Sequence, residues 1–259
     1  MKLFCRLFLL TWVCLICPSV SASDTDLLQL ASLEWPPYVS LSLPAEGISA
    51  SIVKAAAQLA GLHTEIQYFP WSRAVQEGLH NPAYAGYFPA FYLKEREKSC
   101  YFSGPLGNSI IGFAALKEKK FNWQKLDDLK PYLVGTVYGY ANGVGFDELV
   151  KQKAIATDSA PSDISNLRKL LAHRVDVVVI DKFVLQQLLI TDNSLASNKS
   201  EIVFHPKELT NFSLHICFQH NDKGHSLQKS FDSGLGKVNV KKLENLYFLQ
   251  LQTKQPHQP

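Results

Sequence analysis

A charged run separates two apolar stretches in the segment "AFYLKEREKSCYFSGPL", residues 90–106. Residues 94–98 are Lys, Glu, Arg, Glu and Lys, and an aromatic segment with a Gly-Pro break follows almost at once. A cluster of this kind is usually a solvated turn between strands, because charged side chains lose hydration when they are buried. Alternatively, one of these charges points into a cleft and holds an anion. The strands and helices predicted around the run are needed to distinguish the solvated turn from the anion site.

Motifs typical of enzymatic or metal chemistry are missing from the sequence. It has no G-x-S-x-G elbow, no P-loop and no H-E-x-x-H zinc motif. His215, His220 and His225 are five residues apart, whereas a spacing of three or four would place two rings on one helix face. We therefore expect no metal and no cofactor. Glu34 is the best candidate for a catalytic acid or base, although it would serve equally as a carboxylate at the rim of a cleft.

Residues 1–22 are typical of a secretory signal peptide. Two basic residues, Lys2 and Arg6, precede an apolar core, and small residues offer a cleavage point after Ala22. We therefore expect an exported, periplasmic protein. Loss of the segment lowers the net charge from +3 to +1, which is too little for a polybasic surface. We expect no nucleic-acid partner.

Two cysteines, Cys100 and Cys217, would remain in the mature chain. In an oxidising compartment they could form a disulfide. The sequence alone cannot place their Cα atoms within bridging range, so two buried free thiols are an equal alternative.

Strands and helices are predicted to alternate along the first hundred residues. Apolar residues with period 2 predict strands, and apolar residues at helical spacing predict helices. The predicted elements are, in order, strand 27–35, helix 49–62, strand 64–69, helix 71–79 and strand 83–92. This order favours parallel strands joined by crossover helices.

The alternation starts again after the charged run. The predicted strands are 108–116, 132–138, 175–180, 201–204 and 212–218. The predicted helices are 139–152 (which opens on a glycine turn), 162–174, 181–189, 227–238 and 241–252. Two successive α/β units with a helical C-terminus indicate two lobes, and the tail 253–259 is expected to fray.

Six motifs follow one another in a characteristic order: "EWPPYV", "EGISASIVKAAAQLAG", "PWSRA", "KEREKSCYFSGPL", "LVGTVYG" and "HRVDVVVIDKFV". Together they resemble the family 3 extracellular solute-binding proteins, the periplasmic receptors of polar amino acid transporters. The resemblance implies an α/β, two-lobed type II periplasmic-binding fold with an interlobe cleft and two hinge strands. It places lobe 1 at residues 23–109 and 214–252, and lobe 2 at residues 110–213.

The resemblance assigns Arg96 and Asp181 to the ligand. In the family, an Arg before an "F-S-x-P" motif grips the ligand carboxylate, and two parallel N–H groups of a guanidinium match the two oxygens. The acid at the position of Asp181 takes the ligand's α-ammonium. From the residues alone, Arg96 could instead pair with a neighbouring Glu on the surface. Asp181 could cap the helix after it, either instead of binding the ligand or together with it, because one carboxylate has several acceptor sites.

Aromatic residues are expected to line the same cleft. Trp35 and Tyr38 follow the first strand, where the family places a ring against the ligand. Trp71 and Arg73 would line the opposite wall. As alternatives, both rings after the first strand could simply pack within the lobe, and Arg73 could pair with Glu77 one helical turn on.

The second lobe offers a glycine turn at residues 139–143, which includes Tyr140 and Asn142. Backbone N–H groups at the start of a helix form a natural anion site, although a plain strand-to-helix loop would look the same.

The chain departs from the family pattern at several positions. Leu93 replaces a Thr, and Phe88 and Phe91 of "FPAF" stand where the family has small hydroxyl residues. Tyr140 likewise stands in a turn where the family has hydroxyls. Aromatic rings thus replace hydroxyl donors in both lobes, which argues against a standard α-amino acid. The site would take a larger or flatter anion, or it would rely on backbone donors.

From these observations we expect a monomeric binding protein that captures a small anionic or zwitterionic solute, an amino acid or a related compound. Its further partner would be the permease of an ABC-type importer or a membrane receptor. Two alternatives remain, namely an enzyme of dehydratase type on the same fold and a ligand-sensing adaptor.

Overall fold

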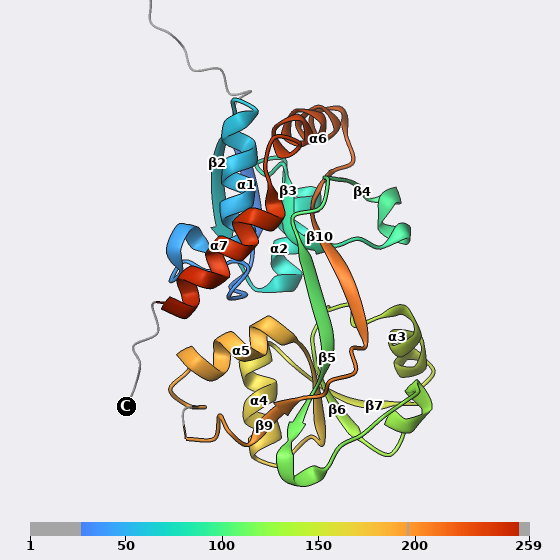
Figure 1. Ribbon diagram of the computed structural model, residues 1–259. Helices are drawn as coiled ribbons and strands as arrows, with labels where there is room; N and C mark the ends of the chain where they lie inside the picture. The colour runs from blue at the N-terminus through green and yellow to red at the C-terminus, as the bar shows by residue number, and fades with distance from the viewer. Residues whose placement is uncertain (1–26, 196, 254–259) are drawn as a thin grey trace, which may run out of the picture.

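The computed structural model of the chain describes residues 27–195 and 197–253. The predicted signal peptide lies outside these residues, as does the predicted tail apart from Thr253, which ends helix α7. Figure 1 shows two lobes joined by two long strands, β5 and β10. In the described part of the chain, no helix is long and apolar enough to cross a membrane.

Lobe 1 contains the predicted parallel strands. The first strand pairs in parallel with the second and the third, and helices surround them. The elements are β1 (Leu27–Ser32), α1 (Ile48–Leu59), β2 (His63–Tyr68), α2 (Trp71–His80), β3 (Gly86–Phe91), α6 (Asp222–Leu235) and α7 (Val240–Thr253). Helices α1 and α6 pack so closely that a Cβ atom on Gly234 would lie 2.0 Å from the carbonyl oxygen of Ala56. Helix α6 begins earlier than predicted because the Asn221 side chain caps it.

Lobe 2 repeats the α/β arrangement. Its elements are β5 (Asn108–Leu116), β6 (Leu133–Val137), α3 (Val144–Lys151), β7 (Ala156–Ala160), α4 (Asp163–Leu171), β8 (Val177–Asp181), α5 (Lys182–Thr191) and β9 (Ile202–Phe204). Strand β7 was not predicted from the sequence, because "ATDSA" is short and polar. It is an edge strand that pairs in parallel with β6 alone among the described strands.

Two antiparallel strands, β5 and β10 (Thr210–Gln219), connect the lobes. Residues 210–213 of β10 pair with β5, and residues 214–219 pair with β3 and β4 (Cys100–Phe102). The described strands therefore form one continuous sheet in the order β2-β1-β3-β10-β5-β8-β6-β7. The expected lobe boundaries fall inside these connecting strands and stay predictions.

Four short 3-10 helices complete the described structure: η1 (Pro44–Glu46), η2 (Lys94–Lys98), η3 (Lys117–Lys119) and η4 (Leu126–Leu129). Helix η2 is the charged run "KEREK", and it connects β3 to the unpredicted strand β4. Its backbone closes through two hydrogen bonds, from Arg96 N–H to the Leu93 carbonyl at 2.9 Å and from Ser99 N–H to the Arg96 carbonyl at 2.8 Å.

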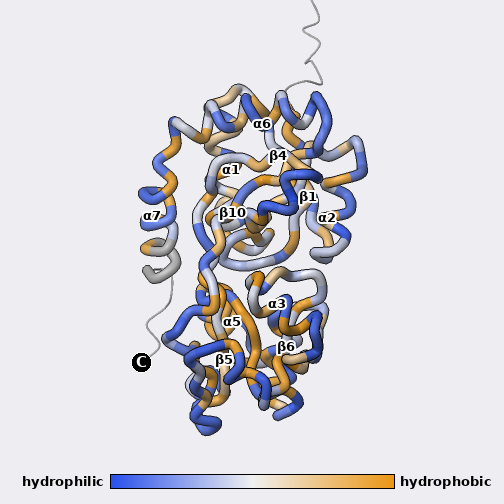
Figure 2. The backbone as a smooth tube through the Cα atoms, turned by 90° about the vertical axis from the view of Figure 1, so that its right-hand side faces the viewer, coloured by the Kyte–Doolittle hydropathy of each residue, from blue (hydrophilic) through white to orange (hydrophobic). Residues whose placement is uncertain are grey.

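Hydrophobic segments gather in the interior of each lobe, whereas hydrophilic residues follow the outer helices and loops (Figure 2). One cluster beside β3 and β10 contains Cys100 and Cys217, which form a disulfide. Of the two alternatives that the sequence left open, the structure therefore has the cross-linked one.

Candidate ligand-binding cleft

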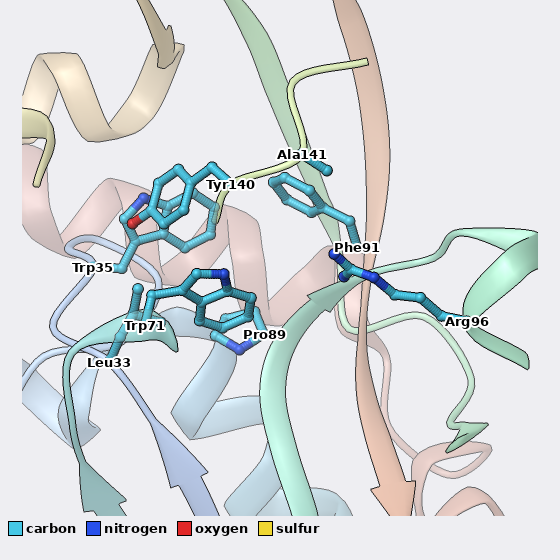
Figure 3. Close-up of a pocket in the computed structure, with 8 residues that line it drawn as sticks. All are labelled: Leu33, Trp35, Trp71, Pro89, Phe91, Arg96, Tyr140 and Ala141. Atoms are coloured by element: carbon cyan, nitrogen blue, oxygen red, sulfur yellow. The ribbon is translucent and has the colours of Figure 1, made fainter. Parts of the chain in front are cut away.

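Two adjoining hollows lie between the lobes. The first, which we call the inner pocket, is lined by Leu33, Trp35, Trp71, Pro89, Phe91, Arg96, Tyr140 and Ala141 (Figure 3). The second, which we call the outer cleft, shares Leu33 and the rings of Trp35, Trp71 and Tyr140, and extends to Glu34 and Asp163. The outer cleft has a volume of about 480 Å³. The inner pocket has only about 20 Å³, which is room for a single water molecule.

Arg96 differs from the rest of its charged run. It is half-buried at one end of the inner pocket, whereas Lys94, Glu95, Glu97 and Lys98 are exposed. Figure 3 shows its guanidinium reaching toward Phe91. Within residues 27–195 and 197–253, no carboxylate lies within 4.0 Å of its nitrogens. The neighbouring glutamates therefore leave the guanidinium unpaired.

The hydroxyl groups of Tyr87 and Tyr92 interact with different residues of the charged run. Burial raises the pKa of the Tyr87 hydroxyl, and the nearby guanidinium of Arg96 partly offsets this rise. On the exposed side, the Tyr92 hydroxyl donates a hydrogen bond of 2.6 Å to Glu97 and so engages that carboxylate. Arg96 is thus the cation of this run that the fold turns inward.

Aromatic rings from both lobes form the walls of the inner pocket. The ring of Trp35 stacks on Tyr38 at 4.4 Å and meets Phe91 and Tyr140 edge-on at 6.1 and 6.5 Å. Trp71 meets Tyr140 edge-on at 6.1 Å. Its indole N–H donates to the Gly139 carbonyl of lobe 2 at 3.2 Å, so the same ring also ties the lobes together.

Asp181 is fully engaged by the protein. It caps helix α5, because its Oδ1 accepts hydrogen bonds from the backbone N–H groups of Phe183 at 2.7 Å and Val184 at 2.9 Å. Its Oδ2 accepts from the hydroxyls of Ser109 at 2.7 Å and Tyr38 at 3.0 Å. Burial raises the pKa of this carboxyl, and the four donors oppose the rise. The capping alternative therefore describes its contacts.

Tyr38 lies under the cleft instead of lining it. Its side chain is only 2% exposed, and its hydroxyl reaches Asp181 of lobe 2 and the Asn108 carbonyl of β5. The packing alternative from the sequence thus describes its place in the structure.

Three further expected residues are not brought to the cleft. Phe88 is fully buried in the core of lobe 1. Arg73 is exposed, pairs with Glu77 at 3.4 Å and lies over the ring of Phe69. Asn142 is buried, and its backbone N–H donates to Asp147. The next backbone N–H in the turn donates to the same carboxylate, so the glycine turn holds an anion of its own chain.

Asp163 is a buried carboxyl in the outer cleft that sequence reasoning missed. It begins α4, directly after the N-cap Ser162. Burial raises the pKa of Asp163 to about 7, the charge of Asp181 adds to the rise, and the Trp35 indole N–H opposes it. Burial and the charge of Asp163 together raise the pKa of Tyr140. The only sequence signal was an acid at a helix start, which does not distinguish a surface position from a cleft.

The described residues contain no group of three His, Cys, Asp or Glu side chains that could hold a metal ion. The polar chemistry of the cleft consists of a guanidinium in the inner pocket and carboxyl groups in the outer cleft.

Comparison with known proteins identifies the fold of the chain. No family model and no curated protein matches the sequence. Many solved structures match almost its whole length. An ancestral arginine-binding protein bound to arginine has a TM-score of 0.72 at 17% identity, over 86% of this chain and 98% of that one.

Two other matches belong to different kinds of protein. The GluR0 ligand-binding core from Nostoc punctiforme, in complex with L-glutamate, has a TM-score of 0.69 at 18% identity, over 85% of this chain and 99% of that one. A histidine kinase sensor domain similar to periplasmic binding proteins has a TM-score of 0.71 at 15% identity, over 86% of this chain and 94% of that one. The chain therefore has the type II periplasmic-binding fold, which confirms the predicted resemblance at the level of the fold.

Proposed function

We propose that this protein is a periplasmic solute-binding protein that captures a small anionic or zwitterionic molecule between its lobes for an ABC-type importer. The observation that carries the proposal is the half-buried guanidinium of Arg96, which has no carboxylate partner among the described residues, in a pocket whose other lining residues are aromatic or apolar. Proteins with the same fold bind arginine or glutamate. These neighbours support an amino acid or a related compound as the ligand class.

Arg96 is suited to hold a carboxylate. A guanidinium presents two parallel N–H groups, and both hydrogen bonds strengthen when the site is closed to water. The rings of Trp35, Trp71 and Tyr140 would hold the flat or apolar body of the same molecule. Asp181 has no acceptor left for an α-ammonium, so we propose that the ligand is recognised differently from a standard α-amino acid.

Binding requires the lobes to separate. The inner pocket holds about one water molecule, and contacts such as Trp71 with Gly139 close it. Strands β5 and β10 are the hinge through which we propose that the lobes open, because both run from one lobe to the other.

The test begins with a thermal-shift screen of amino acids and small carboxylates, followed by titration calorimetry with the strongest binder. Arg96→Gln should weaken binding by at least about 100-fold, because two charge-assisted hydrogen bonds of roughly 1.5–3 kcal/mol each are lost. Arg96→Lys should restore only part of the affinity, since an ammonium lacks the planar fork.

Lys98→Gln is the matched control, because it removes an exposed cation of the same 3-10 helix. It should change the affinity less than about twofold. Equal, small losses at Arg96 and Lys98 would show that the run is a solvated turn and would remove the proposed site. Turnover of the bound molecule, followed by NMR, would instead support the enzyme alternative.

A further inference from the structure

The geometry points to a second subsite in the cleft, in which Asp163 and the rings of Trp35, Trp71 and Tyr140 receive an organic cation, such as an ammonium or guanidinium group, carried by the ligand whose carboxylate meets Arg96. This inference rests on the proposed function, since it assigns the other end of the same molecule. The ligand class becomes a dipolar compound with separated charges.

The carboxyl group of Asp163 is buried and still open to the cleft. The residue is 7% exposed and lines the outer cleft at the start of α4. The Trp35 indole N–H and the backbone N–H of Asp163 itself both lower its pKa. The Trp35 indole nitrogen has no hydrogen-bond partner of ordinary geometry within the described residues. Asp163 therefore retains acceptor capacity for a ligand.

The unpaired indole N–H of Trp35 is an independent sign that this corner is incomplete. Trp35 is 5% exposed, and burying a donor without a partner is unfavourable because the donor loses its hydrogen bond to water. A cation beside Asp163 would favour the ionised carboxylate. One carboxylate oxygen could then accept from the indole N–H, and the other from the ligand, so both groups would be satisfied together.

Aromatic rings surround the position that the cation would take. Tyr140 stands edge-on to both Trp35 and Trp71, with interplanar angles of 78° and 90°, and all three border the outer cleft. Ring faces attract cations within about 6 Å, and the attraction grows when the site is desolvated. Figure 3 shows Trp35 and Tyr140 at the end of the inner pocket opposite Arg96.

The charged side chains that line the outer cleft have one sign. Among the described residues, its lining includes two carboxyl groups, Glu34 and Asp163, and no basic side chain, although the guanidinium of Arg73 lies over the ring of Phe69 at its border. Asp181 adds negative charge from the adjacent helix start. Tyr68 and Tyr140 are the other titratable groups in this lining, and burial raises the pKa of both, so they stay neutral. The outer cleft thus favours positive charge, whereas Arg96 favours negative charge in the inner pocket.

The experiment uses the whole mature chain and probes of defined charge. Calorimetric titrations compare ω-amino carboxylates, from 4-aminobutanoate to 8-aminooctanoate, with the matching carboxylates that lack the amine. At pH 8 the best ω-amino carboxylate should bind about 10- to 100-fold more tightly than its matching carboxylate, as expected for a charge-assisted hydrogen bond. Asp163→Asn should remove the advantage of the amine, so that the two kinds of carboxylate bind equally tightly. Glu208→Gln, an exposed acid of lobe 2 outside the cleft, should keep it.

The pH dependence gives a second readout. The ratio should fall as the pH drops below about 7, where Asp163 becomes protonated, and it should not vary with pH in Asp163→Asn. If carboxylates bind through Arg96 but the amine brings no advantage, or if Asp163→Asn retains the advantage, the inference is overturned and the proposed function stands. If no carboxylate binds and Arg96→Gln has no effect, the proposed function itself fails.

Discussion

Helices α4 and α5 of lobe 2 each begin at a buried aspartate beside the lobe boundary, yet the two carboxyl groups have opposite surroundings. Asp181, the N-cap of α5, accepts four hydrogen bonds, from two backbone N–H groups and the hydroxyls of Tyr38 and Ser109. Asp163, the first residue of α4, faces the outer cleft beside an indole N–H that finds no partner. The same residue type at the same kind of position is structural in one case and available in the other.

The difference comes from neighbours that are distant in the sequence. Tyr38 and Ser109 are 143 and 72 positions from Asp181, and they bring hydroxyls from lobe 1 and from β5. Around Asp163 the corresponding space holds the aromatic rings of the cleft. A buried carboxylate with fewer donors than Asp181 has is held at a cost in stability, which is typical of residues that serve a ligand. Three experiments test this contrast.

The largest effect should be the pH-dependent loss of stability that Asp163 causes. Its pKa is raised on folding to about 7, so the folded state binds the proton more tightly than the unfolded state does. The free energy of unfolding should therefore fall as the pH rises from about 4 to 7, by up to roughly 4 kcal/mol, and level off above. Asp163→Asn mimics the protonated form and should escape this loss.

Urea unfolding of both proteins at pH 5, 6, 7 and 8 measures the difference. Glu208→Gln serves as a control, and its difference from the unmodified protein should stay flat across this range. If the difference in the free energy of unfolding between Asp163→Asn and the unmodified protein does not vary with pH, then Asp163 is solvated and its pKa is not raised on folding.

Asp181→Ala should produce the next largest effect, in the opposite direction from the removal of Asp163. It removes the cap of α5 and leaves the buried Ser109 hydroxyl without its acceptor, whereas the Tyr38 hydroxyl keeps the Asn108 carbonyl. Loss of a cap costs about 1 kcal/mol and an unsatisfied group about 1–3 kcal/mol, so the sum is roughly 3 kcal/mol. The melting temperature should fall by about 6–12 °C for a chain of this size.

The matched comparison for this substitution is Ser162→Ala at the cap of α4. Its hydroxyl accepts from the Ser165 N–H at a long 3.4 Å, so the loss should be near 0.5 kcal/mol. Comparable losses at the two caps would contradict the contrast between the helix starts.

Among the substitutions at Asp163, Asp181 and Tyr38, Tyr38→Phe should have the smallest effect, about 1 kcal/mol, because Asp181 keeps three of its four donors. The lost hydroxyl is a contact between the lobes, so the variant should also populate the open form more. Small-angle scattering of the ligand-free protein would detect this as a larger radius of gyration. An unchanged radius together with an unchanged melting temperature would show that this contact does not hold the lobes.

Local patterns predicted most of the fold but only part of the site. Periodicity identified the main strands and helices, whereas the polar edge strand β7 has no apolar pattern to reveal it. In the cleft, Arg96, Trp35, Trp71, Phe91 and Tyr140 were expected and are brought together.

The residues that were expected there but lie elsewhere have geometric reasons. Phe88 is fully buried in the core of lobe 1, whereas Phe91, three positions further along β3, lines the inner pocket. Arg73 is two positions after Trp71 on α2 and projects from another side of the helix. The roles of Asp181 and Asp163 depended on which side chains of other elements meet them, which periodicity does not contain.

The disulfide constrains the polypeptide of lobe 2 differently from that of lobe 1. Cys100 and Cys217 are 117 residues apart, and every described element of lobe 2, from β5 to β9, lies between them. Lobe 2 is therefore a closed ring of polypeptide whose base is fastened inside lobe 1. A single break of the chain anywhere in that ring would leave one molecule with no released fragment. The ring also has fewer conformations to gain when it unfolds, so the cross-link stabilises the lobe that contains no cysteine of its own.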